Sequence, residues 1–199
     1  MKTKLFFKKH IQIGVSQIIF FIFFVFCGFT FSQPLPGEAK AAFEYLNLIR
    51  ENPGIFSKEI GVDLKKANKL PPLIWNDTLA IVALQKAEDM AKRGYFAHLN
   101  PEGEGINILI HKAGYFLPPE WTKDKKANFF ESLNAGTKTG KGAIADLILD
   151  SYDSSKGHRK HLLGLNEFYR NLTDIGIGHI HSDGSKFGYY TVVIIAKHK

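Results

Sequence analysis

The sequence predicts an α+β protein, a three-layer α-β-α sandwich with a central, mainly antiparallel sheet. Several segments between residues 39 and 163 carry apolar residues at helical spacing. The chain then changes to a two-residue period, and residues 189–196 form an almost continuous apolar run rich in Val and Ile. A strand that is apolar along its length must be covered on both faces, so we expect helices on each side of the sheet.

The N-terminal segment has the pattern of a secretory signal peptide. Four lysines and no acidic residue precede the apolar run Ile18–Phe26. Thr30 and Ser32 then place small residues three and one positions before a break at Gln33. We predict a signal peptide over residues 1–32. The alternative is an uncleaved membrane anchor, because the apolar stretch is almost long enough to span a bilayer.

Removal of this segment changes what the composition implies. The chain has 26 basic and 19 acidic residues, and without the four lysines of the signal the basic residues number 22. This modest charge argues against nucleic-acid binding. The single cysteine, Cys27, lies in the signal, so the exported domain has no disulfide. We expect a short linker at 33–38 and one domain at 39–199, secreted or periplasmic, monomeric and without membrane contact after cleavage.

The first elements of the domain are predicted to be helices. Residues 39–50 form an amphipathic helix that Pro53 and Gly54 end, and residues 55–72 read as an irregular connection. A second helix is capped by Asn76 or Asp77, and it stops at Gly94 with Lys92 and Arg93 in its last turn. We expect Trp75 to be buried against the sheet and Trp121, which lies among polar residues and prolines, to be largely exposed.

Shorter elements follow. Residues 106–113 predict a short helix, and residues 129–133 a short strand that places Glu131 at a buried edge. Residues 136–142 resemble a phosphate loop, but the glycine spacing is too short and Gly follows Lys141, so a flexible surface loop is the better interpretation. Two helical segments, 144–152 and 158–163, precede a C-terminal hairpin that turns at Asp183-Gly184.

Two histidines and a glutamate are the candidate functional residues. His98 lies on the exit from the second helix, His158 opens a short helix, and Glu131 lies between them. Two neutral imidazoles and a carboxylate suit a zinc site, and also acid–base chemistry near neutral pH. A Ser155–His158 nucleophile is a weaker hypothesis, because no Gly-x-Ser-x-Gly motif is present. We expect four further histidines at the surface or at strand ends: His111, His161 (a spare ligand at most), His179 and His181.

Six blocks of the sequence stand in a recognisable order. They are YLNLIRENP, LPPLIWNDTLAIVALQKAEDMAKRGYFAH, NPEGEGINILIHKAGY, FFESLNAGT, SSKGHRKHLLG and DIGIGHIHSDGSKFGYYTVVI. Together these blocks are similar to the CAP superfamily, the cysteine-rich secretory, antigen 5 and pathogenesis-related proteins, also called the SCP domain. The likeness runs from about Ala39 to the C-terminus and is closest to the bacterial secreted branch. It implies a three-layer sandwich with a cleft, where many members hold zinc or another divalent ion on two His and two Glu.

The resemblance assigns site residues position by position. His98 matches the family's first His, Glu131 the first Glu and His158 the second His. No Glu stands at the place of the second Glu, where the chain offers Asp150 or, more weakly, Asp146 and Asp153. Ser132 replaces the usual Asn after the cleft Glu. The expected cleft is completed by Asp150, Ser155 and Arg159.

These residues support two hypotheses about function. The first is an exported module that binds an unknown extracellular ligand, with a metal organising the cleft. The second is a metal-dependent, peptidase-like hydrolase acting on peptides or cell-envelope polymer, with zinc on His98 and His158 and Glu131 as the general base. We favour binding, because a catalytic zinc site ordinarily has three protein ligands and a separate base.

Overall fold

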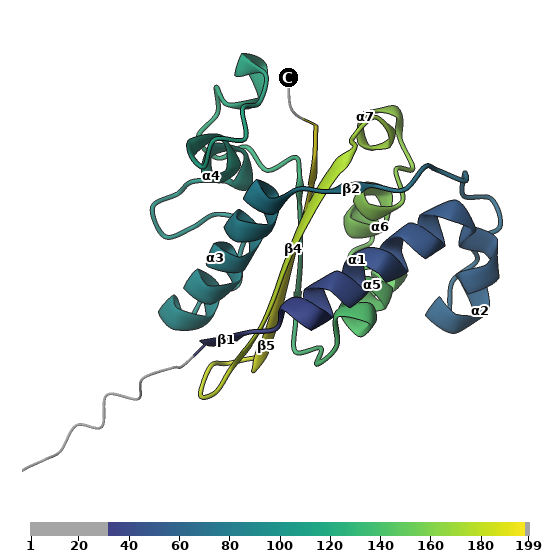
Figure 1. Ribbon diagram of the computed structural model, residues 1–199, viewed down its shortest axis with the longest axis horizontal. Coiled ribbons are helices and arrows are strands. Elements are labelled where there is room, and N and C mark those ends of the chain that lie inside the picture. Colours follow the sequence, from purple (N-terminus) through teal and green to yellow (C-terminus); the bar gives the residue numbers. More distant parts are fainter. Residues whose placement is uncertain (1–31, 198–199) are drawn as a thin grey trace, which may run out of the picture.

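Two layers of helices enclose a central sheet, as the sequence predicts (Figure 1), and the sheet has five strands. The computed structural model describes residues 32–197. The predicted signal segment, Cys27 included, lies outside the described residues apart from Ser32. No helix within residues 32–197 is both long enough and apolar enough to cross a membrane.

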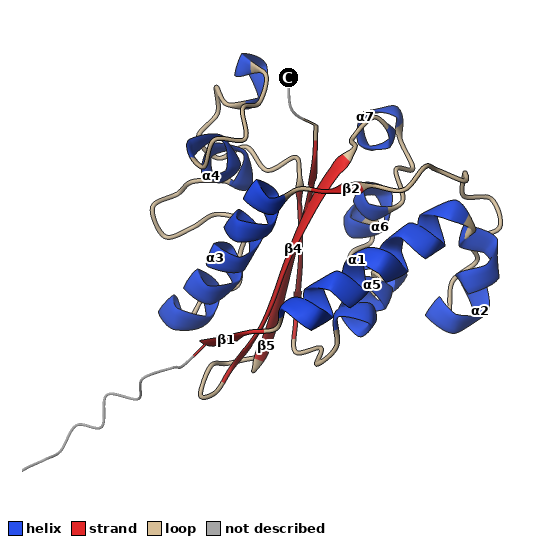
Figure 2. Ribbon diagram, viewed as in Figure 1, coloured by secondary structure: helices blue, strands red, loops and turns tan. Residues whose placement is uncertain are grey.

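The sheet is built on the C-terminal hairpin, β4 (Asp174–Ser182) and β5 (Tyr189–Ala196) (Figure 2). β3 (Glu131–Ala135) pairs antiparallel with the other side of β5 and ends the strand order. Two short strands share the outer side of β4: β1 (Ser32–Pro34) pairs antiparallel at one end, and β2 (Ile74–Trp75) pairs parallel at the other. The sheet is therefore mainly antiparallel, as expected.

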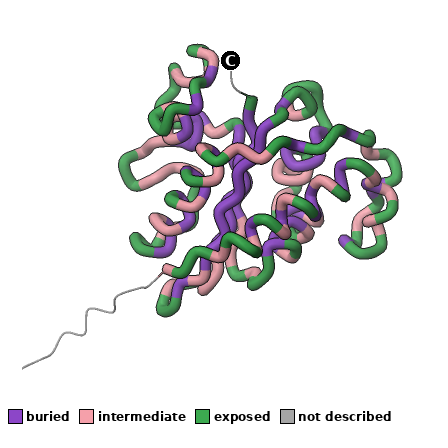
Figure 3. Tube along the Cα trace, in the orientation of Figure 1, coloured by how far each residue is buried: buried purple, intermediate pink, exposed green. Residues whose placement is uncertain are grey.

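Each face of the sheet carries its own helices. α3 (Asp77–Arg93) and α4 (Ile106–Lys112) lie on one side (Figure 1). The opposite layer contains α1 (Pro36–Glu51), α5 (Gly140–Leu149) and α6 (Gly157–Leu162). Short turns complete the fold: 3₁₀ turns at Pro53–Phe56 and Pro119–Trp121, α2 (Ser57–Ile60) and α7 (Glu167–Arg170). The buried residues gather on the strands and the inward sides of the helices (Figure 3).

α3 is the helix that the sequence defines most sharply, and its packing positions the site. The Asn76 side chain accepts the Leu79 N–H at its start, and Gly94 ends it in the left-handed conformation (φ 69°). Gly176 and Gly178 of β4 face α3, and a Cβ at Gly178 would collide with the α3 backbone. The helix therefore rests directly on the strand, which fixes where the chain leaves it.

Three stretches differ from the sequence prediction. Residues 33–38 are not a linker, because they contain the end of β1 and the start of α1, with Pro36 in its first turn. Residues 55–72 include helical turns. The predicted loop 136–142 is partly helix: α5 begins at Gly140, which is buried and whose N–H donates to the Glu38 carboxylate at 2.8 Å. Tyr152, expected on that helix, is exposed beyond its end.

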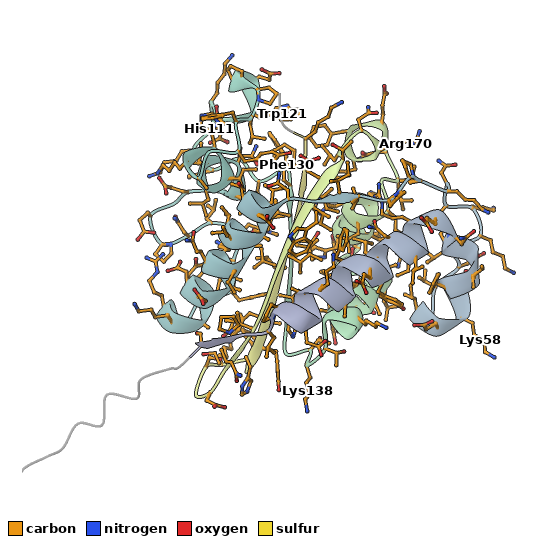
Figure 4. All side chains as sticks on the ribbon, in the orientation of Figure 1. Lys58, His111, Trp121, Phe130, Lys138 and Arg170 are labelled. Atoms are coloured by element: carbon orange, nitrogen blue, oxygen red, sulfur yellow. The ribbon has the colours of Figure 1, made fainter. Side chains whose placement is uncertain are left out.

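The predicted contrast between the two tryptophans is wrong. Trp75 is only half-buried, with an edge contact to Phe43 and its Nε1–H donating to Asp77. Trp121 is also half-buried, because it packs edge-on against Phe130, its neighbour in Figure 4. Both rings gain part of their burial from contacts that their own sequence neighbourhoods do not reveal.

His179 is likewise not a surface residue. It is buried in the middle of β4, where Nδ1 bonds the Thr191 hydroxyl (2.7 Å) and Nε2 bonds the carbonyl of Lys138 (3.0 Å). A carbonyl oxygen only accepts, so Nε2 carries the proton and Nδ1 accepts from Thr191. Burial lowers the pKa of His179. This histidine joins the loop before α5 to the sheet and has no free nitrogen for a ligand.

Candidate functional site

His98 and His158 come from opposite layers of the sandwich and meet beside β3. His98 lies in the loop after α3, and His158 lies in the first turn of α6. Their ring centroids are 6.5 Å apart, with the ring planes inclined by 37°. Glu131, the first residue of β3, lies next to His98. The fold therefore brings these three predicted residues together across a long stretch of sequence.

Each of the two histidines is bonded to a buried carboxylate. Nδ1 of His98 lies 2.8 Å from Glu131 Oε2, and Nδ1 of His158 lies 2.8 Å from Asp150 Oδ1. The imidazole side chains are 43% and 28% exposed, whereas the carboxylates are 0% and 4% exposed. An ionised carboxylate only accepts, so both Nδ1 atoms carry the proton and each neutral ring presents the Nε2 lone pair. This is the arrangement that prepares a histidine to hold a metal.

Asp150 supplies the second carboxylate, and its backbone explains why. It ends α5 in the left-handed conformation (φ 51°), which Asp tolerates better than most residues. From there its carboxylate also accepts the backbone N–H of His158 (3.1 Å) and, at the longer distance of 3.4 Å, that of Arg159. Asp146 instead accepts from Thr137 on the surface. Of the three candidate aspartates, only Asp150 is hydrogen-bonded to a site imidazole in the way Glu131 is.

A buried lysine supports the first pair. The ammonium of Lys86 on α3 donates to the carbonyl of His98 (3.1 Å) and lies 3.4 Å from the Tyr95 hydroxyl. Burial lowers the pKa of Lys86, and the nearby Glu131 charge opposes that shift. Burial raises the pKa of Glu131, while the His98 hydrogen bond and the Lys86 charge oppose it. Lys86 and Glu131 therefore stabilise each other's charge away from water, and the His98 hydrogen bond further stabilises the Glu131 carboxylate.

Sequence reasoning missed Lys86, although a signal was present. It lies seven residues after Leu79 and four before Met90, on the apolar face of α3. A lysine at a position where the helical period requires an apolar residue must find a polar partner inside the fold. The partner here is the chain segment that carries His98.

His161 is not a surface residue. It is buried, and its Nδ1 is 2.7 Å from the Ser132 hydroxyl. Its ring also lies against Tyr169. Burial is the main cause that lowers the pKa of His161 to about 3. Ser132, the residue after the cleft Glu, thus ties β3 to α6 through a neutral imidazole.

Two other predicted cleft residues have structural contacts instead. The Ser155 hydroxyl donates to the Asp153 carboxylate in the turn before α6. Arg159 Nε donates to the Ile148 carbonyl and Nη2 to the Leu149 carbonyl, which satisfies the C-terminal end of α5. Neither side chain is among the residues that line the cavity beside His158.

That cavity has a volume of about 700 Å³ and follows β3. Leu133 to Gly136 line it along the strand. Phe96 and Phe187 contribute one aromatic side, and the α5 segment from Asp146 to Asp150 contributes a polar side. The volume falls within the range of ordinary ligand sites.

The donor set fits a divalent metal in two alternative ways. One ligand atom each from Asp150, Asp153 and His158 lies within 4.8 Å of the others, a group that could hold an ion. These carboxylates are already hydrogen-bonded, Asp150 to His158 and Asp153 to the Gly157 N–H. In the second arrangement the ion is held by the Nε2 atoms of His98 and His158, which would not have to give up a hydrogen bond to the described residues. Two histidines on one tetrahedral zinc have ring centroids about 5 Å apart, so the rings would need to approach by roughly 1.5 Å.

Comparisons with known proteins agree with this architecture. A model of the cysteine-rich secretory protein family (CAP) matches residues 43–195. An extracellular protein with an SCP domain from Bacillus anthracis is similar in structure, with 23% identity and a TM-score of 0.50, over 81% of this chain and 41% of that one. An outer surface protein from Borrelia burgdorferi is 19% identical with a TM-score of 0.55, over 85% of this chain and 100% of that one. At these identities the structural likenesses show the fold alone. No curated protein matches the sequence.

Proposed function

Because the chain belongs to the cysteine-rich secretory protein (CAP) family, we propose that it is an exported binding module whose cleft holds a divalent metal ion on His98 and His158. The observation that carries this proposal is the pair of neighbouring imidazoles, each bonded at Nδ1 to a buried carboxylate. Zinc commonly takes neutral imidazoles as ligands in proteins, so zinc is the ion that we test first. Export is supported by the N-terminal pattern and by the extracellular and outer-surface relatives.

The protein's contribution to this site is orientation and charge. Glu131 and Asp150 hold the Nδ1 protons, so they direct the Nε2 lone pairs of the two rings toward an incoming ion. Their negative charges offset the charge of a cation while their own oxygens stay buried. His98 is the more exposed ring and lies on a loop, so it is the residue expected to move inward when an ion binds.

The structure favours binding over hydrolysis as the role of this cleft. A general base must reach the proton that it removes. The Glu131 carboxylate is fully buried, with Oε2 bonded to His98, which supports a role in holding that ring rather than in removing a proton from water. Glu131 therefore acts as a positioning residue for His98.

Zinc titration of the untagged protein by calorimetry tests the proposal. Stoichiometric binding is expected, with affinity that falls as the pH is lowered because protons compete for the imidazoles. His98→Ala and His158→Ala should each weaken binding by roughly 100-fold or more, since each removes a direct ligand.

Asp153→Asn is the matched control, because it changes only the alternative Asp150–Asp153–His158 group. Unchanged zinc affinity in this variant is the expected result. If Asp153→Asn abolished binding while His98→Ala did not, the ion would belong to that alternative group, and the proposed two-histidine site would be wrong.

A further inference from the structure

The outer edge of β3 is open along the cavity. β3 ends the strand order, and no strand within residues 32–197 pairs with its outer side. Ile195 N–H donates to Phe130 O, and Gly136 N–H donates to Tyr189 O. Because hydrogen-bonded pairs alternate along an antiparallel ladder, the even-numbered residues bond to β5, and the N–H and C=O groups of Leu133 and Ala135 face the cavity.

The walls on the two sides of this edge differ in chemistry. Phe96 and Phe187 pack with ring centroids 5.5 Å apart, and Phe96 remains 41% exposed. The other wall of the cavity carries Asn134 of β3 and the exposed Asp146 of α5. One wall therefore suits an apolar side chain, and the other suits a polar or charged one.

The polar wall carries a buried hydrogen-bond acceptor to which no described residue donates. Oδ1 of Asn134 is buried and has no partner among the described residues. The Asn134 amide nitrogen lies 3.4 Å from the Asp146 carboxylate, whose other contact is the Thr137 hydroxyl. An unpaired buried acceptor beside a carboxylate calls for a donor that carries positive charge, since leaving a buried polar atom unpaired costs free energy.

From these observations we propose that the cleft binds an extended peptide as an additional strand on the β3 edge, with a basic side chain reaching Asn134 and Asp146. The proposal deepens the proposed function, because it names the ligand class of the same cleft. The open N–H and C=O groups of Leu133 and Ala135 bind the peptide backbone whatever its sequence. One end of the added strand lies beside His98 and His158, where the metal is proposed.

Side-chain alternation gives the peptide a recognisable pattern. Successive residues of a strand point to opposite faces of the sheet. One residue therefore contacts Phe96 and Phe187, and the next reaches Asp146 and Asn134. The preferred ligand alternates apolar and basic residues, and an acidic residue at the basic positions is repelled by Asp146.

The test uses an acetylated, amidated hexapeptide of alternating Phe and Arg, titrated against the protein in the presence of EDTA. Two analogues carry N-methyl groups on the Phe amides or on the Arg amides. Only one of these sets faces β3, so one analogue should bind roughly tenfold more weakly and the other like the parent. If the peptide runs antiparallel to β3, methylation of the Phe amides is the change that weakens binding. The peptide residue opposite Leu133 then points to the same face of the sheet as Leu133, and its amide faces β3.

Charge is tested with a protein variant. Asp146→Asn should weaken the Arg peptide about threefold, as for an exposed ion pair, and leave a norleucine version of the peptide unchanged. Asp63→Asn, an exposed aspartate near α2, is the matched control and should have no effect.

Three results would overturn the peptide proposal: no saturable binding at millimolar peptide, equal affinity for the two methylated analogues, or saturation by a chito-oligosaccharide where the peptide fails. The metal proposal is tested separately, because zinc is titrated without peptide and the peptide without metal.

Discussion

His161 should make the protein acid-sensitive, although it binds nothing in the proposed site. In the folded protein its ring is buried against Ser132 and Tyr169, and its pKa falls to about 3. In the unfolded chain an imidazole titrates near 6.5. Between these values the unfolded state binds a proton and the folded state does not, so stability is lost as the pH falls from about 6.5 toward 3.

The size of the effect follows from the two pKa values. Each pH unit inside this window removes up to about 1.4 kcal/mol from the free energy of unfolding. From neutral pH to pH 5, His161 alone should account for a loss of about 2 kcal/mol. His179, whose pKa is also lowered by burial, contributes a decrease of the same sign.

Urea unfolding at pH 7 and pH 5 measures this loss. His161→Gln keeps a polar, neutral side chain but removes the titrating group, so the variant should lose about 2 kcal/mol less than the wild type over the same interval. The control His181→Gln changes a partly exposed histidine at the end of β4 and should keep the wild-type loss. An identical pH dependence for His161→Gln and the wild type would refute the reasoning, whatever the variant's stability at pH 7.

Three further predictions concern packing and support. Gly178→Ala should destabilise the fold by roughly 2–3 kcal/mol in urea unfolding, because its methyl group overlaps the α3 backbone; a change below about 0.5 kcal/mol would contradict the close contact. Lys86→Met should lower the free energy of unfolding by roughly 2–3 kcal/mol, because it leaves the buried Glu131 without its neighbouring cation. The same variant should also bind zinc more weakly. Lys86→Arg should recover part of the zinc affinity. Trp75→Ala and Trp121→Ala should each cost roughly 2 kcal/mol, since both rings are half-buried; a difference greater than twofold would show that one environment is misjudged.

The elements that the sequence predicts well are those whose signals are local. α3 carries its cap at Asn76, its apolar stripe and its terminating Gly94 within one continuous stretch. The β4–β5 hairpin likewise follows from alternation and a turn within a short segment. The burial of His161 and His179 is not predicted by the sequence because it depends on distant segments: Ser132 on β3 lies 29 residues from His161, and Lys138, whose carbonyl bonds His179, lies 41 residues away.

The choice of the second carboxylate shows where sequence reasoning stops at this site. Asp146, Asp150 and Asp153 all precede His158, and their spacing does not separate them. What separates them is the end of α5: the left-handed backbone at Asp150 turns its carboxylate toward the first N–H groups of α6 and toward the imidazole of His158. A helix that ended one residue earlier or later would present Leu149 or Ser151 in place of Asp150, so the identity of the site residue is set by where α5 ends.

The same dependence explains why the two histidines form one site. His98 is placed by α3, which rests on β4 through Gly178, whereas His158 is placed by α6, which is bonded to β3 through Ser132 and His161. β3 touches both imidazole supports, because its Glu131 bonds His98 and its next residue, Ser132, bonds His161 on α6. A ligand that adds to the free edge of β3 would therefore reach a strand to which both halves of the site are attached. Peptide and metal binding are for that reason expected to be coupled, and zinc affinity measured with and without saturating peptide should differ by the same factor as peptide affinity measured with and without zinc.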